Sequence, residues 1–201
     1  MEKKGFNKAE FAGKLDWIFA SHFDNLNNRP CVFLSHKKED KPACIEVANY
    51  LRDAGIDYYL DIEDQGLQYA SSINDPVKIT ESIKKGIRES THMMVVVSEK
   101  TVQSHWVPFE IGYGHASILD QNRLTDENNT IKLSVLTLKD IAEKTLPDYL
   151  RVGYIIQGTK SLNEYITKIS DRLEKSMTNE SQIIYHGARK HPLDNILNWQ
   201  L

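Results

Sequence analysis

Trp106 and Glu110 are the two residues whose types and spacing first suggest chemistry. They lie four positions apart in a segment with helical character, so both side chains should project from one face of the helix. A carboxylate beside a flat aromatic ring suits a substrate that contains a ring. From spacing alone we favour the ordinary interpretation, a core tryptophan next to a solvated glutamate, because most aromatic residues are buried and most glutamates exposed.

Other polar candidates follow the apparent strands. Ser35, His36 and Lys37 come directly after the apolar run 31–34, and Asp61 lies near the end of a second strand-like segment. In an open α/β sheet, ligands bind outside the carboxyl ends of the strands. His36 and Lys37 could hold a pyrophosphate there. The alternatives are that Ser35 caps a turn and that His36 and Lys37 are solvated loop residues.

The common nucleotide and metal motifs are absent from the sequence. There is neither a GxGxxG nor a GxxxxGK[ST] segment, so a nucleotide would have to be held in another way. The seven histidines show no HExxH or other metal-ligand spacing, and Cys31 and Cys44 show no CxxC spacing. We therefore predict no metal site and two reduced core cysteines.

Composition and charge limit the class of protein. A chain of 201 residues with 40% apolar content suits one domain of ordinary size. The net charge of −3 gives no broad electrostatic reason to bind nucleic acid or an anionic membrane. No stretch approaches the roughly 18 apolar residues of a membrane span, and no secretion signal is recognisable. We expect a cytoplasmic protein with no nucleic-acid or membrane partner.

Strand and helix patterns alternate along the chain. Helical periodicity marks segments within 40–55, 79–87, 104–119 and 162–173. Apolar or alternating runs predict strands at 31–35, 56–62, 93–97, 131–138 and 154–156. This alternation predicts an α/β fold with a parallel sheet between helices.

Residues 63–78 read as a long polar loop, and loops of that length in compact domains are usually functional. Tyr69 in this segment could close over a substrate as a lid; the alternative is a surface aromatic without a role. Residues 7–28 have the period of a helical face, and the pattern weakens after residue 174. We therefore divide the chain into an N-terminal helical extension (1–30), the main domain (31–174) and a C-terminal extension packed on it (175–201).

Four blocks in this order resemble the signatures of TIR domains. Residues 32–40 (VFLSHKKED) are similar to the first strand of the family, which ends in Phe-x-Ser before a polar turn and an acidic residue. Residues 57–63 are similar to the second strand, before the segment called the BB loop, and residues 94–98 to the third. Residues 104–111 resemble the Trp-x-x-x-Glu-Ile helix of TIR enzymes that consume NAD+. The resemblance implies a flavodoxin-like TIR fold of five parallel strands with helices on both faces.

The resemblance also implies an activity and a site. It implies that the protein cleaves the nicotinamide–ribose bond of NAD+, which is the substrate and not a cofactor, with Glu110 as the catalytic carboxylate. The other residues that it places around the pocket are Phe33, Ser35, His36 and Lys37 at the floor and mouth, Trp106 near the nicotinamide, and Asp61 at the base of the BB loop.

One carboxylate suffices for this chemistry. Ordinary glycosides need an acid for the leaving oxygen as well as a second carboxylate. Nicotinamide is already a cationic pyridinium in NAD+ and leaves as a neutral molecule, so what remains is to stabilise the positive ribose. Two departures from the family pattern are that residues 63–78 are unlike a compact Gly-rich BB loop, and that Pro108 must fall in the first turn of its helix.

The resemblance extends to biological context. The chain looks like the signal-making component of a bacterial antiphage system such as Thoeris, in which an ADP-ribose-derived product, often cyclic, activates a separate effector. TIR enzymes commonly complete their site by self-association through TIR–TIR contacts. Which nucleophile captures the ribose is left open. The alternatives are a non-catalytic TIR interaction module and a nucleoside 2-deoxyribosyltransferase-like enzyme.

Overall fold

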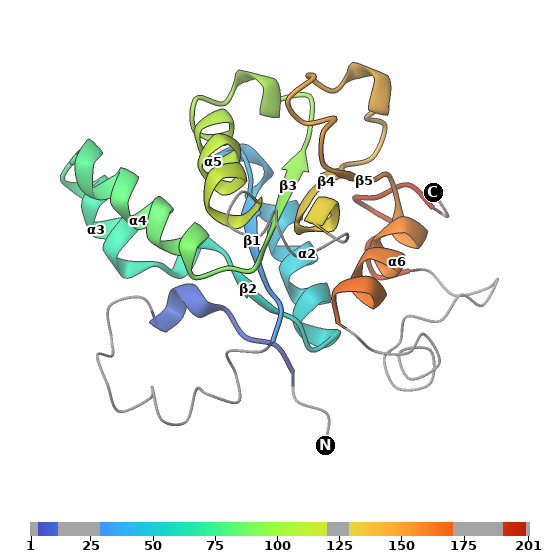
Figure 1. Ribbon diagram of the computed structural model, residues 1–201, viewed down its shortest axis with the longest axis horizontal. Coiled ribbons are helices and arrows are strands. Elements are labelled where there is room, and N and C mark those ends of the chain that lie inside the picture. Colours follow the sequence, from blue (N-terminus) through green and yellow to red (C-terminus); the bar gives the residue numbers. More distant parts are fainter. Residues whose placement is uncertain (1–3, 12–28, 120–128, 171–190, 200–201) are drawn as a thin grey trace.

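The computed structural model describes residues 4–11, 29–119, 129–170 and 191–199. Its centre is a five-stranded sheet in which all neighbouring strands are parallel and the order is β2-β1-β3-β4-β5 (Figure 1). The predicted α/β class and parallel sheet are therefore confirmed. The strands are β1 (Cys31–Ser35), β2 (Asp57–Tyr59), β3 (His92–Val97), β4 (Leu133–Thr137) and β5 (Tyr154–Ile156).

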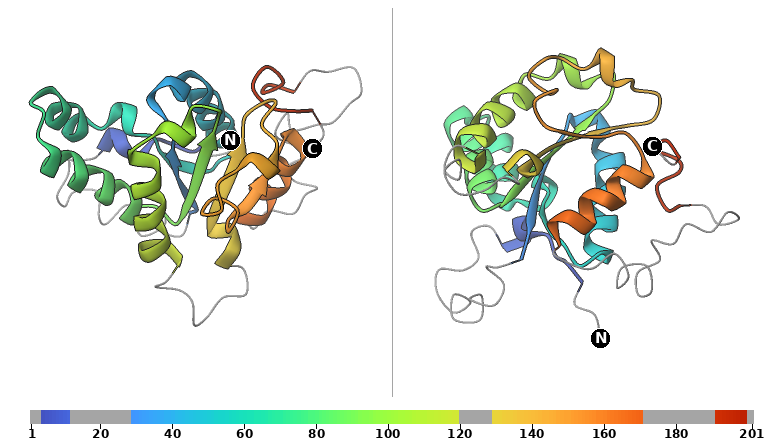
Figure 2. Two further views of the ribbon diagram at one scale, coloured as in Figure 1. Left: turned by 90° about the horizontal axis from the view of Figure 1, so that it is seen from above. Right: turned by 45° about the vertical axis from the view of Figure 1, so that its right-hand side comes forward.

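Helices pack on both faces of this sheet, as predicted (Figure 2). The main ones are α2 (Lys41–Asp53), α3 (Gln65–Ser72), α4 (Pro76–Arg88), α5 (Trp106–Gly114) and α6 (Thr159–Ile169). Short 3-10 helices are η1 (Lys8–Phe11), η2 (Lys38–Asp40), η3 (Asp61–Glu63), η4 (Thr101–Gln103), η7 (Asn129–Lys132) and η8 (Glu143–Thr145), and η5 (His115–Leu119) is a π-helix.

The strand side chains alternate between two apolar clusters. Leu34 packs into the cluster that contains the buried faces of α2 and α6. Its neighbour Phe33 packs into the cluster that contains buried residues of α3, α4 and α5. Because both faces are covered, β1 and β3 are apolar almost throughout, which explains why their sequences read as continuous hydrophobic runs.

The strand order creates a crevice between β1 and β3. The chain leaves β1 towards α2 on one face and leaves β3 towards α5 on the other, while the two strands pair directly with each other. Ligands of open α/β sheets bind at such a switch point, outside the carboxyl ends of the strands. The fold thus brings together the loops that the sequence marked as chemically interesting.

The prediction of a long loop at 63–78 was wrong, because two helices occupy most of this segment. Asp64 caps α3, its Oδ1 accepting a hydrogen bond from the backbone N–H of Leu67 at 3.0 Å. Asp75 caps α4 through the N–H groups of Val77 and Lys78, both at 3.1 Å. These caps satisfy backbone donors at the start of each helix and stabilise helices that are otherwise largely polar.

Two element boundaries also differ from the sequence prediction. The second strand covers only Asp57–Tyr59, and the 3-10 helix η3 replaces its predicted end. The predicted helix to residue 119 is α-helical only as far as Gly114 and then continues as a π-helix. The N-cap residue of α5 is His105, which makes no side-chain cap bond, and Ser104 Oγ just before it accepts from Val107 N at 3.2 Å. Pro108 lies in the first turn of α5 as required.

Parts of both predicted extensions are described. Residues 8–11 form the 3-10 helix η1, whereas 12–28 of the predicted N-terminal helix lie outside the described residues. Leu193 and Leu197 of the C-terminal segment are buried in the cluster with α2 and α6, and the predicted polar and apolar pieces within 171–190 lie outside the described residues. In the part of the chain that is described, no helix is long and apolar enough to cross a membrane.

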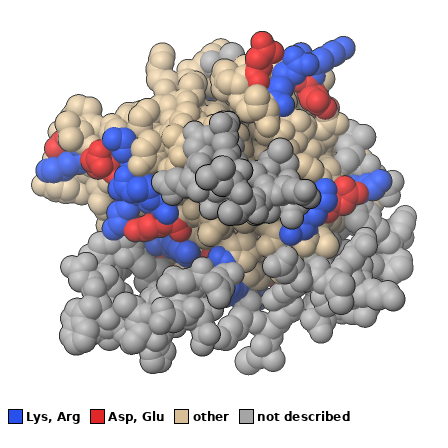
Figure 3. All heavy atoms as spheres, in the orientation of Figure 1, with Lys and Arg blue, Asp and Glu red and all other residues tan. Residues whose placement is uncertain are grey.

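Acidic and basic side chains are mixed on the surface. Figure 3 shows Lys and Arg beside Asp and Glu on the face in view. On α4, Lys84 Nζ lies 2.9 Å from Glu81 Oε1 and Lys85 Nζ lies 3.8 Å from Glu89 Oε1. Exposed pairs of this kind contribute little to stability.

Candidate active site

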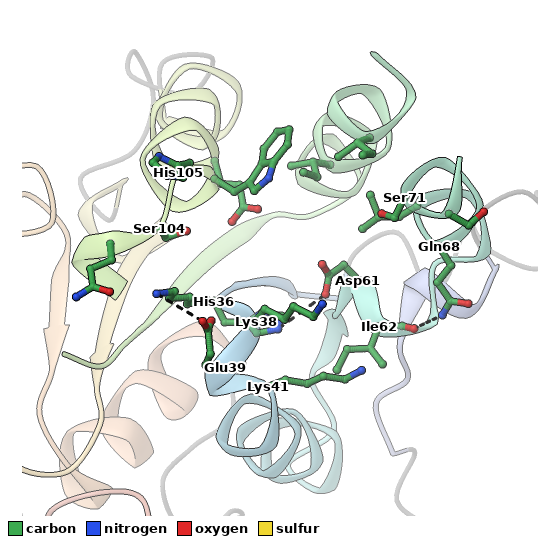
Figure 4. A pocket seen from close by; sticks show the side chains of 18 residues that line it. His36, Lys38, Glu39, Lys41, Asp61, Ile62, Gln68, Ser71, Ser104 and His105 are labelled. Carbon is green, nitrogen blue, oxygen red and sulfur yellow. Dashed lines mark hydrogen bonds and ion pairs between the residues drawn. The ribbon is translucent and has the colours of Figure 1, made fainter. Parts of the chain in front are cut away.

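A cleft of about 850 Å³ opens at the carboxyl ends of β1, β2 and β3. Figure 4 shows Asp61, Ile62, Gln68 and Ser71 on one side, Ser104 and His105 on the other, and Lys38, Glu39 and Lys41 near the start of α2. The volume lies within the usual range of small-molecule and cofactor sites. The lining residues are His36, Lys37, Lys38, Glu39, Lys41, Asp61, Ile62, Leu67, Gln68, Ser71, Ser72, Ile79, Ile83, Gln103, Ser104, His105, Trp106 and Glu110.

Glu110 is a buried acid in the wall of this cleft. It lies in the second turn of α5, and its residue surface is only 8% exposed. Its Oε2 accepts a hydrogen bond of 2.5 Å from Ser35 Oγ, at the end of β1. This contact joins the two sides of the crevice between β1 and β3.

Burial makes Glu110 a weaker acid than an ordinary glutamate. Loss of solvent raises its pKa from 4.5 to about 7, the hydrogen bond from Ser35 opposes that rise, and the negative charge of Asp61 adds to it. Both the protonated and the ionised form are therefore populated near neutral pH. Such a pKa, in a cleft and with specific neighbours, is typical of functional carboxylates.

Trp106 lies at the rim of the cleft, one helical turn before Glu110. It is 41% exposed, and its ring meets that of Phe109 edge-on, with centroids 5.9 Å apart. Both Trp106 and Glu110 line the cleft, as the resemblance to TIR domains implied, whereas their spacing predicted only a shared helix face. The ordinary interpretation, a buried tryptophan and a solvated glutamate, is therefore wrong: the acid is buried and the aromatic ring is partly exposed.

His36 and Asp61 face each other across the base of the cleft. His36 Nδ1–H donates to the carbonyl oxygen of Leu34 at 3.3 Å, and His36 Nε2 lies 4.0 Å from Asp61 Oδ1. Burial raises the pKa of Asp61, while His36 and Lys41 act in the opposite direction. Lys37 Nζ lies 3.7 Å from Glu39 Oε1 at the mouth. The cleft thus combines two acids of reduced strength with several cationic side chains.

The sequence interpretation missed several residues that line the cleft. Lys41 begins α2, and its position directly after the β1 loop was a usable signal, since the starts of such helices lie at the carboxyl ends of the strands. Gln68 and Ser71 were missed because α3 was predicted as loop. Gln68 Nε2 donates to the carbonyl of Ile62, which connects α3 to η3 across the cleft wall.

Three predicted site residues, Phe33, Tyr69 and Ser35, do not line the cleft. Phe33 is buried in the core, where its ring stacks on Tyr59 with centroids 5.7 Å apart. Tyr69 is 61% exposed on α3, and Lys78 Nζ lies 5.7 Å from the centre of its ring. Ser35 is also absent from the lining residues, but it contacts the cleft indirectly through its hydrogen bond to Glu110.

A sequence model of the family described as TIR domain matches residues 32–140. The chain belongs to the TIR domain family. The match covers β1 to β4 and includes the cleft residues from His36 to Glu110. Among the described residues of this TIR domain, no group of three or more His, Cys, Asp and Glu side chains is placed to hold a metal ion, and the absence of a metal site stays a prediction.

One relative of the TIR domain is named "Putative cyclic ADP-D-ribose synthase TIR2", from Cytobacillus dafuensis. The two sequences are 26% identical over 106 residues, which is 51% of this chain. The aligned part spans 27% of the relative's length.

Proposed function

We propose that this TIR domain protein cleaves the nicotinamide–ribose bond of NAD+, with Glu110 as the catalytic carboxylate. The observation that carries the proposal is the burial of Glu110 in the wall of a cleft of about 850 Å³, inside the segment matched by the TIR family. The relative's name, a cyclic ADP-D-ribose synthase, supports the same substrate. NAD+ is a substrate here, and no cofactor is required.

The bond cleavage needs one ionised carboxylate. The electron pair of the ribose C1′–N bond goes to the nicotinamide nitrogen, which leaves neutral, and positive charge develops on the ribose. Glu110, when ionised, stabilises that charge and accepts hydrogen bonds from the ribose hydroxyls. Because the carboxylate is buried beside Ser35, water screens this interaction less than at an open surface.

Other cleft residues bind the rest of NAD+. The partly exposed ring of Trp106, one turn from Glu110, offers a flat surface to the nicotinamide. His36, Lys37 and Lys41 provide N–H donors for the diphosphate, which suits charge-assisted hydrogen bonds to phosphate oxygens. These roles place the reacting bond near α5 and the diphosphate near the start of α2.

The product that we propose is a cyclic ADP-ribose-derived signal. A nucleophile of the same molecule would capture the ribose after nicotinamide leaves, as the relative's name supports. The signal would act on a separate effector in bacterial antiphage defence of the Thoeris type, in the cytoplasm. Self-association of TIR domains would enclose the open side of the cleft.

The proposal is tested by incubating concentrated protein with NAD+ and identifying the products by mass spectrometry. Glu110→Gln should lower nicotinamide release by about 100-fold or more, because it removes the charge that stabilises the transition state. Glu164→Gln is the control, since it neutralises an exposed glutamate on α6, which packs against the other face of the sheet.

Three outcomes would contradict the proposal. Equal release by wild type and folded Glu110→Gln removes the catalytic role of the acid. Intact NAD+ in a sample that demonstrably self-associates favours a non-catalytic interaction module. Base exchange between a deoxynucleoside and a free base, without NAD+ loss, identifies a deoxyribosyltransferase.

A further inference from the structure

The N-terminal segment 5–9 lies against the end of α2 and the free edge of β2. Gly5 N donates to Arg52 O at 2.9 Å, Tyr58 N donates to Phe6 O at 3.1 Å, and Asn7 forms a parallel bridge with Tyr58. The approach is close: a Cβ atom on Gly5 would lie 1.9 Å from the carbonyl oxygen of Ile56. The segment therefore extends the sheet beyond its last named strand.

The side chain of Asn7 makes the hydrogen bonds to Leu60, the residue after β2, that a neighbouring strand would otherwise make. Asn7 is 2% exposed. Its Oδ1 accepts from Leu60 N at 3.0 Å and from Ala9 N at 3.1 Å, and its Nδ2 donates to Leu60 O at 3.1 Å and to Glu63 Oε2 at 3.5 Å. A primary amide has the same donor and acceptor as a peptide group, so it satisfies both backbone groups of Leu60.

This contact fixes the turn that carries Asp61 into the cleft. Leu60 directly precedes η3, whose first two residues, Asp61 and Ile62, line the cleft (Figure 4). From the cleft side the same turn is held by Gln68, which donates to Ile62 O, and His36 Nε2 lies 4.0 Å from Asp61 Oδ1. On the side away from the cleft, Asn7 holds the turn through its hydrogen bonds to both backbone groups of Leu60.

We propose that Asn7 is a positioning residue for the reaction, which acts by holding residues 60–63 so that Asp61 faces His36. The inference rests on the proposed cleavage of NAD+. Without the amide, the buried N–H and C=O of Leu60 lose their partners, and leaving such groups unpaired is costly. The turn then moves towards water, and Asp61 leaves its place opposite His36, which is one of the proposed donors for the diphosphate, so NAD+ binds more weakly.

Hydrogen exchange tests the structural half without any substrate. In Asn7→Ala, the amide of Leu60, which donates to Asn7 Oδ1, should exchange about tenfold faster or more, because opening the turn no longer breaks that bond. Amides in α6 should keep their rates. Glu10→Gln is the control, since this residue is exposed directly after the segment 5–9. Unchanged exchange at 60–63 would overturn the proposal.

A double-mutant cycle tests the functional half. Asn7→Ala should lower kcat/KM for NAD+ by about tenfold in the wild type and by less than about twofold in Asp61→Asn, because both changes act on the same group. A merely structural role would give the same loss in both backgrounds, and that result overturns the proposal. If Asn7→Ala does not fold, Asn7→Ser keeps a small polar group but cannot pair with both the N–H and the C=O of Leu60 as an amide does, and it should show the same coupling with Asp61→Asn.

The hydrogen-exchange measurement and the double-mutant cycle together distinguish failure of this proposal from failure of the proposed function. If the wild type releases no nicotinamide from NAD+, the proposed function fails, and the exchange rates still decide whether Asn7 holds the turn. If the wild type is active but the cycle shows no coupling to Asp61, the positioning role fails and the proposed function stands.

Discussion

Replacing Glu110 by Gln should make the protein more stable at alkaline pH. The pKa of Glu110 is about 7 in the folded state against an ordinary value of 4.5, because burial disfavours the charged form. Between these pH values the unfolded chain has released a proton that the folded protein still holds. Unfolding therefore becomes easier as the pH rises through this window, and no such penalty exists below pH 4.5.

The magnitude follows from the difference between the two pKa values. The full penalty is about 3 kcal/mol once the folded carboxyl is ionised, and about 2.5 kcal/mol of it develops between pH 5 and pH 8.5. Gln is neutral and keeps an oxygen that can accept from Ser35 Oγ, so Glu110→Gln removes the penalty without removing that bond. The variant should gain on the wild type as the pH rises.

The assay is urea unfolding of wild type and Glu110→Gln at pH 5 and pH 8.5. The gap in unfolding free energy should widen by about 2.5 kcal/mol, whereas the exposed control Glu164→Gln should stay within about 0.5 kcal/mol of the wild type at both pH values. A gap that stays constant or narrows with rising pH would refute the reasoning, because it would mean that the folded state does not desolvate this carboxyl.

The remaining predictions concern the pH profile of the reaction and the packing of α4. Ser35→Ala should move the acidic limb of nicotinamide release to higher pH, because the hydrogen bond from Ser35 lowers the pKa of Glu110 and its removal raises that pKa. Asp61→Asn should move the limb to lower pH, because the negative charge of Asp61 raises the same pKa. Initial rates from pH 5 to pH 9 check both, and shifts in the same direction would contradict them. Gly86→Ala should destabilise the protein by about 1–3 kcal/mol, because the added Cβ would lie 2.4 Å from Cε1 of the Tyr59 ring in β2. Gly112→Ala should stabilise α5 by about 0.5–1 kcal/mol, because its Cβ would meet no atom within 4 Å. Urea unfolding of this pair separates packing from helix propensity, and equal effects would count against the packing argument.

The sheet was predictable because its strands are buried on both faces. Residues 93–97 of β3 form the most apolar run in the chain, and that run is what a central parallel strand requires. The order of strands was not readable from periodicity, since pairing joins segments far apart in the sequence. Only the resemblance to TIR domains implied the arrangement that the structure contains.

The site was predictable in part, because burial depends on contacts that spacing does not reveal. Spacing placed Trp106 and Glu110 on one helical face, yet it favoured the wrong member of the pair as the buried one. What buries Glu110 is the end of β1, where Ser35 is 75 positions away in sequence. The same limit applies to Asn7, the first residue of the predicted helical segment 7–28, which bonds to Leu60, 53 positions further along.

The segment 63–78 shows a different limit. Its polar composition and Gly66 favoured a loop, but Asp64 and Asp75 each stand directly before a helix whose first donors they accept. Cap residues were therefore the signal that the interpretation overlooked. Much of α3 faces solvent or the cleft, so a strong apolar stripe was never needed there.

The hydrogen bond between Ser35 and Glu110 couples the separation of β1 and α5 to the charge of Glu110. If β1 and α5 separate slightly, water reaches the carboxyl group and the acid sheds its proton more readily. If they close, the same group holds its proton more tightly. The separation of β1 and α5 and the charge of Glu110 in the wall of the cleft are therefore coupled, and a ligand that contacts both elements would change that charge without contacting the acid itself.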